Sequence, residues 1–339
     1  MVTIKDIAQA AGVSFSTVSK ALRDSPLVTP ETKRRIIAIA REMGYQPNIA
    51  ARRLVSKRSG AVGVVWPSIE RTALSTLITR VGDRLERRGT AMLLSIGGMD
   101  AAFATFRKFQ VDAILVFGGM EDGESHVPDS VGIPVLSYGT AGLAPLPTVD
   151  VNRGAAIRLA VRHLASLGHR RIAYIGRPER RDPLQDVKIE AFLDETRAIG
   201  IAALDAPVAD VQGMEVHDGY AAARALFAGG PGEDGAARRR PTAVLCGSYD
   251  LTRGVLRAAA EAGLDVPGKL SVASYDNIPQ MEELGVPVTA VGADIDAMAE
   301  LVADSLLRLV EQPDSVGTVT LEPSLVIRAS TMPPSDEGG

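Results

Sequence analysis

Residues 4–22 read IKDIAQAAGVSFSTVSKAL, with a small residue, a glycine and a branched apolar residue at the spacing of two short helices that cross around a tight turn. Ala8 leaves room where the first helix meets the second, Gly12 can adopt the positive φ that the turn requires, and Val18 anchors the second helix from beneath. The stretch therefore predicts helices from about Ile4 to Ala11 and from about Phe15 to Arg23.

Side chains that can cap helices agree with these two starts. Thr3 with Asp6 and Ser14 with Thr17 place short oxygen-bearing side chains where each helix begins. A helix with an inward Val18 and an exposed opposite side fits the major groove of DNA. The candidate DNA contacts in this part of the chain are Thr3, Ser14, Phe15, Ser16, Thr17, Ser19, Lys20 and Arg23. The alternative is an ordinary helical hairpin in which the three residues fall at these positions by accident.

A third helix is predicted from Thr29-Pro30-Glu31, a cap followed by proline at the first helical position, to a stop at Gly44. Asn48 is a plausible cap for a short helical segment that runs to Val55. Residues 56–60 read SKRSG, which is typical of a polar linker. The segment after Asn48 is too short to be a stable helix without a partner.

Charge divides the chain into a basic beginning and an acidic remainder. Residues 1–60 hold eleven Lys/Arg and four Asp/Glu, a net charge of +7, whereas the whole chain has a net charge of −4. The remainder therefore carries −11. A basic excess confined to a helix-turn-helix and its linker is expected for a protein that contacts phosphates.

These motifs together resemble the LacI/GalR family of bacterial repressors. The matching stretch runs from Thr3-Ile4-Lys5-Asp6-Ile7-Ala8 through Val13-Ser14-Phe15-Ser16-Thr17-Val18-Ser19 to Gly44-Tyr45-Gln46-Pro47-Asn48. The resemblance implies a homodimer that binds double-stranded operator DNA through two second helices, with tetramer formation left open. It also implies a hinge helix at residues 48–55 that inserts Leu54 into the central minor-groove step and kinks the duplex. The candidate hinge contacts are Asn48, Ala51, Arg52 and Leu54.

Three side chains of the second helix suggest different kinds of contact. The resemblance places Phe15, Ser16 and Lys20 at positions that face bases. Phe15 could touch a thymine methyl, or it could be a core aromatic, and the sequence leaves both open. Lys20 can donate to guanine O6 or N7. The hydroxyls of Ser16, Thr17 and Ser19 could equally hold phosphates, which position a protein without specifying sequence.

From residue 61 onward short apolar runs alternate with amphipathic stretches, which predicts parallel sheets with helices on both faces. Strands are predicted at 62–66, 91–96, 113–117, 133–138, 171–176, around 208, at 242–245 and at 270–275. Helices are predicted at 72–88, 101–109, 152–167, 186–199, 217–227, 251–262 and 294–310. About 270 residues suit two such lobes with a cleft between them.

The body also resembles the type I periplasmic-binding-protein fold that the family uses for an effector. Matching residues include Ile133-Pro134-Val135, the stretch 160–176 and Leu264-Asp265-Val266-Pro267. We expect a first crossover between the lobes at 140–152 and, from the resemblance, a return at 277–289. The predicted organisation is a head at 1–47, a hinge and linker at 48–60, a two-lobed body at 61–332 and a flexible tail at 333–339.

The effector pocket departs from the family pattern. Where the family commonly has an aspartate, an arginine, an asparagine and a late glutamine, this chain has Gly139, Lys188, Ser248 and Ala293, while Asp276 keeps its expected identity. Ala73 and Leu74 replace an aromatic pair. These changes remove planar groups suited to sugar hydroxyls.

Candidate effector contacts are therefore Arg71, Lys188, Ser248 and Asp276. Two cations near a helix N-terminus favour an anionic effector. The alternatives are a sugar or related effector with Arg71 simply solvated, and a vestigial pocket without an effector. Residues 229–240, GGPGEDGAARRR, are predicted to form a surface loop.

The residues do not suggest catalysis, a metal site or a cofactor. Cys246 ends an apolar run and is expected to be a buried strand thiol. His163 and His169 are six residues apart, a spacing that does not stack them on one helical face. The rival function is an exported sugar receptor of similar fold. Residues 1–20 contain no apolar signal core, and one cysteine in 339 residues fits a reducing cytoplasm. We therefore expect a cytoplasmic, nucleoid-associated regulator without membrane contact.

Overall fold

The computed structural model describes residues 2–22, 24–45, 58–66, 71–117, 132–139, 146–228 and 240–335. It divides into two compact units, Met1–Ser59 and Gly60–Gly339. Arg23, the predicted hinge contacts Asn48, Ala51, Arg52 and Leu54, and the predicted loop at 229–239 lie outside the described residues.

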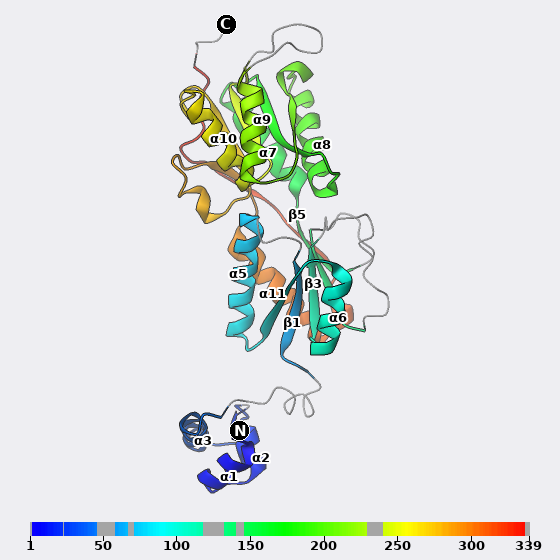
Figure 1. Ribbon diagram of the computed structural model, residues 1–339, viewed down its shortest axis with the longest axis vertical. Helices are drawn as coiled ribbons and strands as arrows, with labels where there is room; N and C mark the ends of the chain where they lie inside the picture. The colour runs from blue at the N-terminus through cyan, green and yellow to red at the C-terminus, as the bar shows by residue number, and fades with distance from the viewer. Residues whose placement is uncertain are drawn as a thin grey trace. The chain divides into compact units, whose positions relative to one another are not determined.

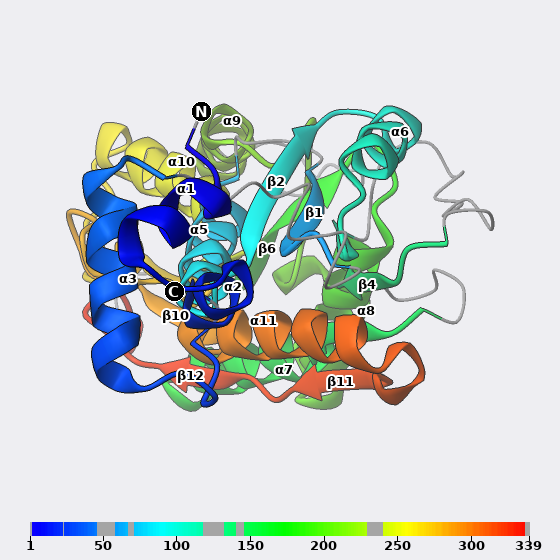
Figure 2. The ribbon, with the colours of Figure 1, turned by 90° about the horizontal axis from the view of Figure 1, so that it is seen from below.

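The first unit contains the three predicted helices, α1 (Ile4–Ala11), α2 (Phe15–Leu22) and α3 (Pro30–Glu42) (Figure 2). Thr3 and Asp6 form a reciprocal capping box, and the Thr17 amide donates to Ser14 Oγ at 3.1 Å. Gly12 has a φ of 63°, as the turn requires. The side chains at the centre of the three-helix core, Ile7, Val18 and Ile36, are fully buried. The predicted helix-turn-helix is confirmed.

The first lobe of the body is a parallel sheet in the order β11-β5-β4-β3-β1-β2. Its strands are β1 (Ala61–Trp66), β2 (Ala91–Ile96), β3 (Ala113–Phe117), β4 (Val135–Tyr138), β5 (Thr148–Val151) and β11 (Thr318–Leu321). Helices α5 (Thr72–Arg87) and α11 (Ile295–Glu311) lie on one face of the sheet and α6 (Met99–Phe109) on the other (Figure 1). The apolar side chains of α5 and α11 share one core, and those of α6 belong to a separate core.

The second lobe repeats this arrangement in the order β12-β10-β9-β8-β6-β7. Its strands are β6 (Ile172–Pro178), β7 (Val208–Val211), β8 (Ala243–Cys246), β9 (Ser271–Tyr275), β10 (Thr289–Gly292) and the antiparallel β12 (Ser324–Val326). The helices α7 (Arg153–Ser166) and α8 (Pro183–Ala198) pack in one core, and α9 (Val216–Ala228) and α10 (Tyr249–Glu261) in the other. Short 3-10 helices lie at Ala203–Asp205, Pro279–Met281 and Pro313–Ser315.

The described chain passes between the lobes at three places. The first lies between β5 and α7, at the end of the predicted stretch 140–152, so that prediction is confirmed. The predicted return at 277–289 is wrong, because β10 is still part of the second sheet and the chain returns between β10 and α11. The third passage joins β11 to β12. The error arose because β10 has only four residues and carries no strong local pattern.

Every predicted strand and helix of the body is present, with boundary shifts of a few residues. Helices α6 and α8 begin at Met99 and Pro183, before the predicted positions 101 and 186. Four short strands, β5, β10, β11 and β12, were not predicted. They are three or four residues long, and pairing with distant strands rather than local pattern gives them their structure.

Candidate functional site

The side chains at the start of α2 are presented to solvent. The exposed fraction of Phe15 is 53%, which excludes the core alternative for this aromatic residue. Thr3, Ser14 and Ser16 are exposed, and Thr17, Ser19 and Lys20 are partly exposed. The described candidates thus include an apolar ring, several hydroxyls and one ammonium group, while Val18 is directed into the core.

Two of the candidate hydroxyls also serve the local fold. Thr3 Oγ1 donates to Asp6 Oδ2 at 2.8 Å, and Ser14 Oγ lies 2.9 Å from Thr17 Oγ1 while it accepts from the Thr17 amide. The hydrogen bonds that Thr3 donates lower the pKa of the Asp6 carboxyl. The Thr3 cap fixes the start of α1 and the Ser14 cap fixes the start of α2, so Phe15 and Ser16 project from a defined helix end.

Three of the four predicted effector residues meet at the carboxyl ends of β8 and β9. Lys188 is 2% exposed, donates to the Gly247 carbonyl at 2.9 Å and places Nζ 3.6 Å from the centroid of the Tyr275 ring. Ser248 caps α10 by accepting from the Leu251 amide at 3.3 Å. Asp276, at a φ of 79°, accepts from the Tyr249 amide through Oδ2 at 3.0 Å. All three groups therefore have structural partners.

The fourth, Arg71, is the N-cap residue of α5 in the first lobe and makes no side-chain capping bond. Burial lowers the pKa of the Lys188 ammonium to about 7. The Asp276 and Asp182 carboxylates oppose this shift, and the positive charges of Arg71 and Arg153 add to it. Arg71 and Lys188, from different lobes, therefore act on each other electrostatically.

The pocket between the lobes at this place is small and mostly apolar. Its volume is about 50 Å³, and its walls include Ala73, Leu74 and Ala293, the positions where the sequence departs from the family pattern. Tyr138 and Asp276 also line it, and burial raises the pKa of the Tyr138 hydroxyl to about 12. Pockets for small molecules usually span about 300–1,000 Å³. An effector of ordinary size therefore requires the lobes to move apart.

The sequence did not single out Arg153, which the fold places at this cleft. It is the first residue of α7, is 9% exposed, and pairs through Nη1 with Asp150 of β5. A Cβ added at Gly139 would lie 2.8 Å from Arg153 Nη2, so this guanidinium fills the space beside the glycine. The burial of an arginine at the start of a helix cannot be predicted from local sequence when, as here, its contacts Asp150 and Gly139 belong to the other lobe.

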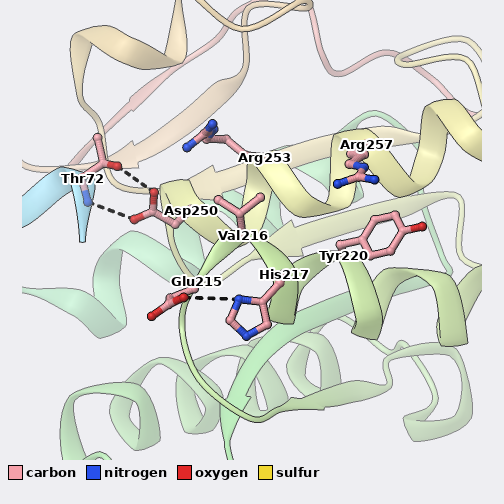
Figure 3. A pocket seen from close by; sticks show the side chains of 8 residues that line it. All are labelled: Thr72, Glu215, Val216, His217, Tyr220, Asp250, Arg253 and Arg257. Carbon is pink, nitrogen blue, oxygen red and sulfur yellow. Dashed lines mark hydrogen bonds and ion pairs between the residues drawn. The ribbon is translucent and has the colours of Figure 1, made fainter. Parts of the chain in front are cut away.

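A direct contact between the lobes lies at the start of α5. Asp250 of α10 accepts from the Thr72 amide at 3.0 Å and from Thr72 Oγ1 at 2.7 Å (Figure 3). Gln280 also donates to Thr76 Oγ1 at 3.1 Å. Because Arg71 does not cap α5, the carboxylate of Asp250 supplies the cap from the opposite lobe.

A mixed polar pocket of about 340 Å³ adjoins this contact. Figure 3 shows its lining, which comes from α5, from the start of α9 and from α10: Thr72, Glu215, Val216, His217, Tyr220, Asp250, Arg253 and Arg257.

We expect Thr72→Ala and Asp250→Asn to be coupled energetically, because Thr72→Ala removes the Oγ1 donor and Asp250→Asn removes the charge and one acceptor oxygen of the same interlobe cap. Thermal or denaturant unfolding of the two single variants and the double variant should give an interaction energy of about 0.5–3 kcal/mol. Asp205→Asn, a substitution at an acidic residue in a 3-10 helix of the second lobe, is the control for charge removal. Strictly additive losses would show that the contact does not hold the lobes together.

The other predicted polar residues have structural roles. Cys246 is fully buried in β8, as predicted, and burial raises the pKa of its thiol to about 12. His169 contacts Thr242 and the Met332 carbonyl, each at 2.9 Å, and His163 contacts Thr331 at 3.0 Å. Among the described residues, no group of three or more His, Cys, Asp or Glu side chains could hold a metal ion. No described helix is both long and apolar enough to cross a bilayer.

Comparison with known proteins matches both parts of the chain. The family model described as bacterial regulatory proteins, lacI family, matches residues 3–48, and a periplasmic binding protein-like domain matches residues 161–331. The HTH-type transcriptional regulator MalR of Streptomyces coelicolor is 31% identical over 99% of this chain and 98% of its own length. The lactose operon repressor of Escherichia coli is 25% identical over 99% and 92%.

Solved structures share the fold. A crystal structure of the lac repressor dimer bound to operator and the anti-inducer ONPF aligns with a TM-score of 0.79 at 24% identity, covering 98% of this chain and 99% of that one.

The helix-turn-helix head is typical of a DNA-binding regulator, and the two-lobed body has the fold of periplasmic binding proteins. Together they define the class of the protein as a DNA-binding regulator with a body of the ligand-binding type. The chain belongs to the LacI family of bacterial regulatory proteins. It is a transcriptional regulator, which confirms the prediction of DNA binding over the alternative of a receptor without DNA function. The family consists of transcriptional regulators rather than enzymes.

Proposed function

We propose that the protein is a repressor that binds a palindromic operator as a homodimer, with α2 in the major groove of each half-site. The observation that carries the proposal is the start of α2, where a rigidly capped helix presents Phe15 and Ser16 to solvent. A helix that enters the groove by its N-terminal residues reads base edges there. Lys20, one turn further along, would donate to a guanine.

The remaining predicted contacts complete this interface. Thr3, Ser14, Thr17 and Ser19 would hold phosphates and set the position of the head. Arg23, Asn48, Ala51 and Arg52 would contact the backbone and the minor groove, with Leu54 as the wedge. In this proposal residues 1–47 form the head, 48–60 the hinge and linker, 61–332 the effector-binding and dimerisation body, and 333–339 a tail. The protein would act in the cytoplasm, on nucleoid DNA.

A small-molecule effector would control DNA binding through closure of the two lobes. The carboxyl ends of both sheets face the cleft, and the Thr72–Asp250 contact joins the lobes in the described conformation. An effector shifts such an equilibrium only if its affinity differs between the two arrangements. A change of lobe angle would then alter the spacing of the two hinge segments in the dimer. One relative of this chain is named for a sugar, the lactose operon repressor.

The proposal is tested by selecting the purified full-length protein, without added ligand, on randomised duplex DNA at near-physiological salt. Sequencing of the enriched pool should give an inverted repeat with a fixed central step. Enrichment of unrelated sequences, or none, would reject operator recognition by the protein alone. The selected duplex then provides the specific DNA for the measurements below.

We expect Lys20→Ala to relax base preference at one position in each half-site. Loss of one good base contact costs about 1–3 kcal/mol of discrimination, whereas loss of a phosphate contact weakens all sequences alike. The measurement is affinity for the selected operator and for single-base variants of each half-site. Lys5→Ala, in exposed α1, is the control for loss of one positive charge. Unchanged base preference in Lys20→Ala would assign Lys20 to phosphate instead.

A further inference from the structure

Unsatisfied polar atoms gather beside Lys188. In the described part of the chain, buried side-chain atoms without a hydrogen-bond partner include the Tyr174 hydroxyl and Gln185 Oε1. Gln185 is 2% exposed and lies one turn before Lys188 on α8. The Tyr174 hydroxyl packs against Gly247, where an added Cβ would lie 2.8 Å from it, and Gly247 is the carbonyl partner of Lys188. Buried polar groups without partners are costly, so these atoms can form hydrogen bonds with a polar ligand at a net gain in free energy.

The guanidinium of Arg153 has donors to spare at the same cleft. Nη1 bonds Asp150 and, at 3.5 Å, the Val151 carbonyl, whereas Nη2 and Nε make no hydrogen bond with the described residues. Nη2 is the atom beside Gly139, at the end of β4 in the first lobe. A guanidinium presents a planar set of N–H donors that matches a carboxylate or a phosphate.

Lys188 adds a second cation that can donate further hydrogen bonds. Its ammonium has three N–H donors, and the Gly247 carbonyl accepts from one of them while the Tyr275 ring lies against the group. The neighbouring carboxylates already have partners, since Asp150 pairs with Arg153 and Asp276 accepts from the Tyr249 amide. Arg71 supplies a third positive charge from the first lobe.

We propose that the cleft binds a small hydroxylated organic anion, with Arg153 and Lys188 holding the anionic group and Tyr174 and Gln185 bonding its hydroxyls. The inference rests on the proposed effector control and names the chemical class of the effector. These four side chains do not line the apolar pocket of about 50 Å³, and the compound reaches them when the lobes part. The anionic group would be a carboxylate or a phosphate, both of which suit the same donors.

The test compares anions with neutral alcohols of the same carbon skeleton by titration calorimetry on the full-length protein. The probes are glycerate, tartrate and glycerol 3-phosphate, with glycerol and threitol as their neutral counterparts. At least one anion should bind about tenfold or more tightly than its alcohol, the effect of one charge-assisted contact. Glycerate and tartrate against glycerol 3-phosphate distinguish a carboxylate site from a phosphate site.

Variants connect this preference to the two cations. Arg153→Met should lower the affinity for the anion about tenfold or more and leave the affinity for the alcohol unchanged. Arg153→Lys keeps the positive charge but loses the planar pair of N–H donors, so its affinity for the anion should lie between those of the unaltered protein and Arg153→Met. Arg170→Met removes an exposed arginine elsewhere in the second lobe and should change nothing. If Arg153→Met does not fold, Arg153→Lys and Lys188→Met carry the comparison.

Proton uptake gives a readout that a purely structural role would not produce. Burial holds the pKa of Lys188 near 7, with Asp276 and Asp182 raising it and Arg71 and Arg153 lowering it. A bound anion raises this pKa, so binding above pH 7 should take up protons, measured in buffers of different ionisation enthalpy. The proposal would be overturned if the protein bound alcohols and anions with equal affinity, or if Arg153→Met bound the anion as tightly as the unaltered protein. It would also be overturned if protein that still binds its selected operator bound no anion. The last outcome leaves the DNA-binding function intact.

Discussion

Gly254→Ala is expected to destabilise the second lobe strongly, although alanine is the better helix former. A Cβ at this position of α10 would lie 2.1 Å from the Val216 carbonyl oxygen and 2.4 Å from the Tyr220 amide nitrogen. Both are backbone atoms of α9, so no side-chain rotation relieves the collision. Helix propensity favours alanine by about 1 kcal/mol, whereas overpacking costs about 1–3 kcal/mol and at times more.

The measurement is the free energy of unfolding of the full-length protein in denaturant. Gly82→Ala in α5 is the matched control, because the nearest atom to its added Cβ is Met92 Cε at 3.0 Å, the end of a flexible side chain. That variant should change stability little or increase it. Equal stability of the Gly254 and Gly82 variants would mean that α9 and α10 can separate without cost. Gly219 of α9 faces the same contact, since its added Cβ would lie 2.3 Å from the Leu251 carbonyl oxygen.

Leu54→Ala is expected to have the largest effect on operator binding. If Leu54 wedges into a central base step, its loss removes the contacts that offset the cost of unstacking the DNA. Affinity for the selected operator should fall by about 1–3 kcal/mol, or about fivefold to 150-fold, while affinity for random DNA, which depends on charge, stays nearly constant.

Fluorescence anisotropy at fixed salt measures both affinities. Leu204→Ala, at a leucine of the second lobe that is 76% exposed, is the matched control and should bind both DNAs normally. Equal losses on specific and random DNA would reject the wedge and assign residues 48–55 to general backbone contact. Replacement of the central base step in the operator provides a second test, because stiff steps should reduce the affinity of the unaltered protein more than that of Leu54→Ala.

The candidate site shows how far single residues can be assigned from sequence. Lys188, Ser248 and Asp276 were predicted together, and the fold brings them together at the ends of β8 and β9. Their hydrogen-bond partners could not be predicted from the sequence, because the ammonium group of a lysine in a cleft can donate equally well to a ligand or to a backbone carbonyl. In the folded protein Lys188 donates to the Gly247 carbonyl and packs against the Tyr275 ring.

The sequence by itself determined the head and the order of the body. Gly12, the Thr3–Asp6 capping box and Val18 act within a few residues of one another, so local spacing specifies helices, turn and inward face. The alternation of apolar runs and amphipathic stretches is also local, and it predicted the two parallel sheets.

Only the tertiary structure decided which distant groups meet. Asp250 caps α5 across 178 residues of sequence, and Arg153 fills the space beside Gly139 from the opposite lobe. Strand β10 joins the second sheet through its pairing with β9, which moves the return crossover beyond Gly292. These features depend on contacts between elements far apart in the chain, and their energies come from burial and geometry that no local pattern encodes.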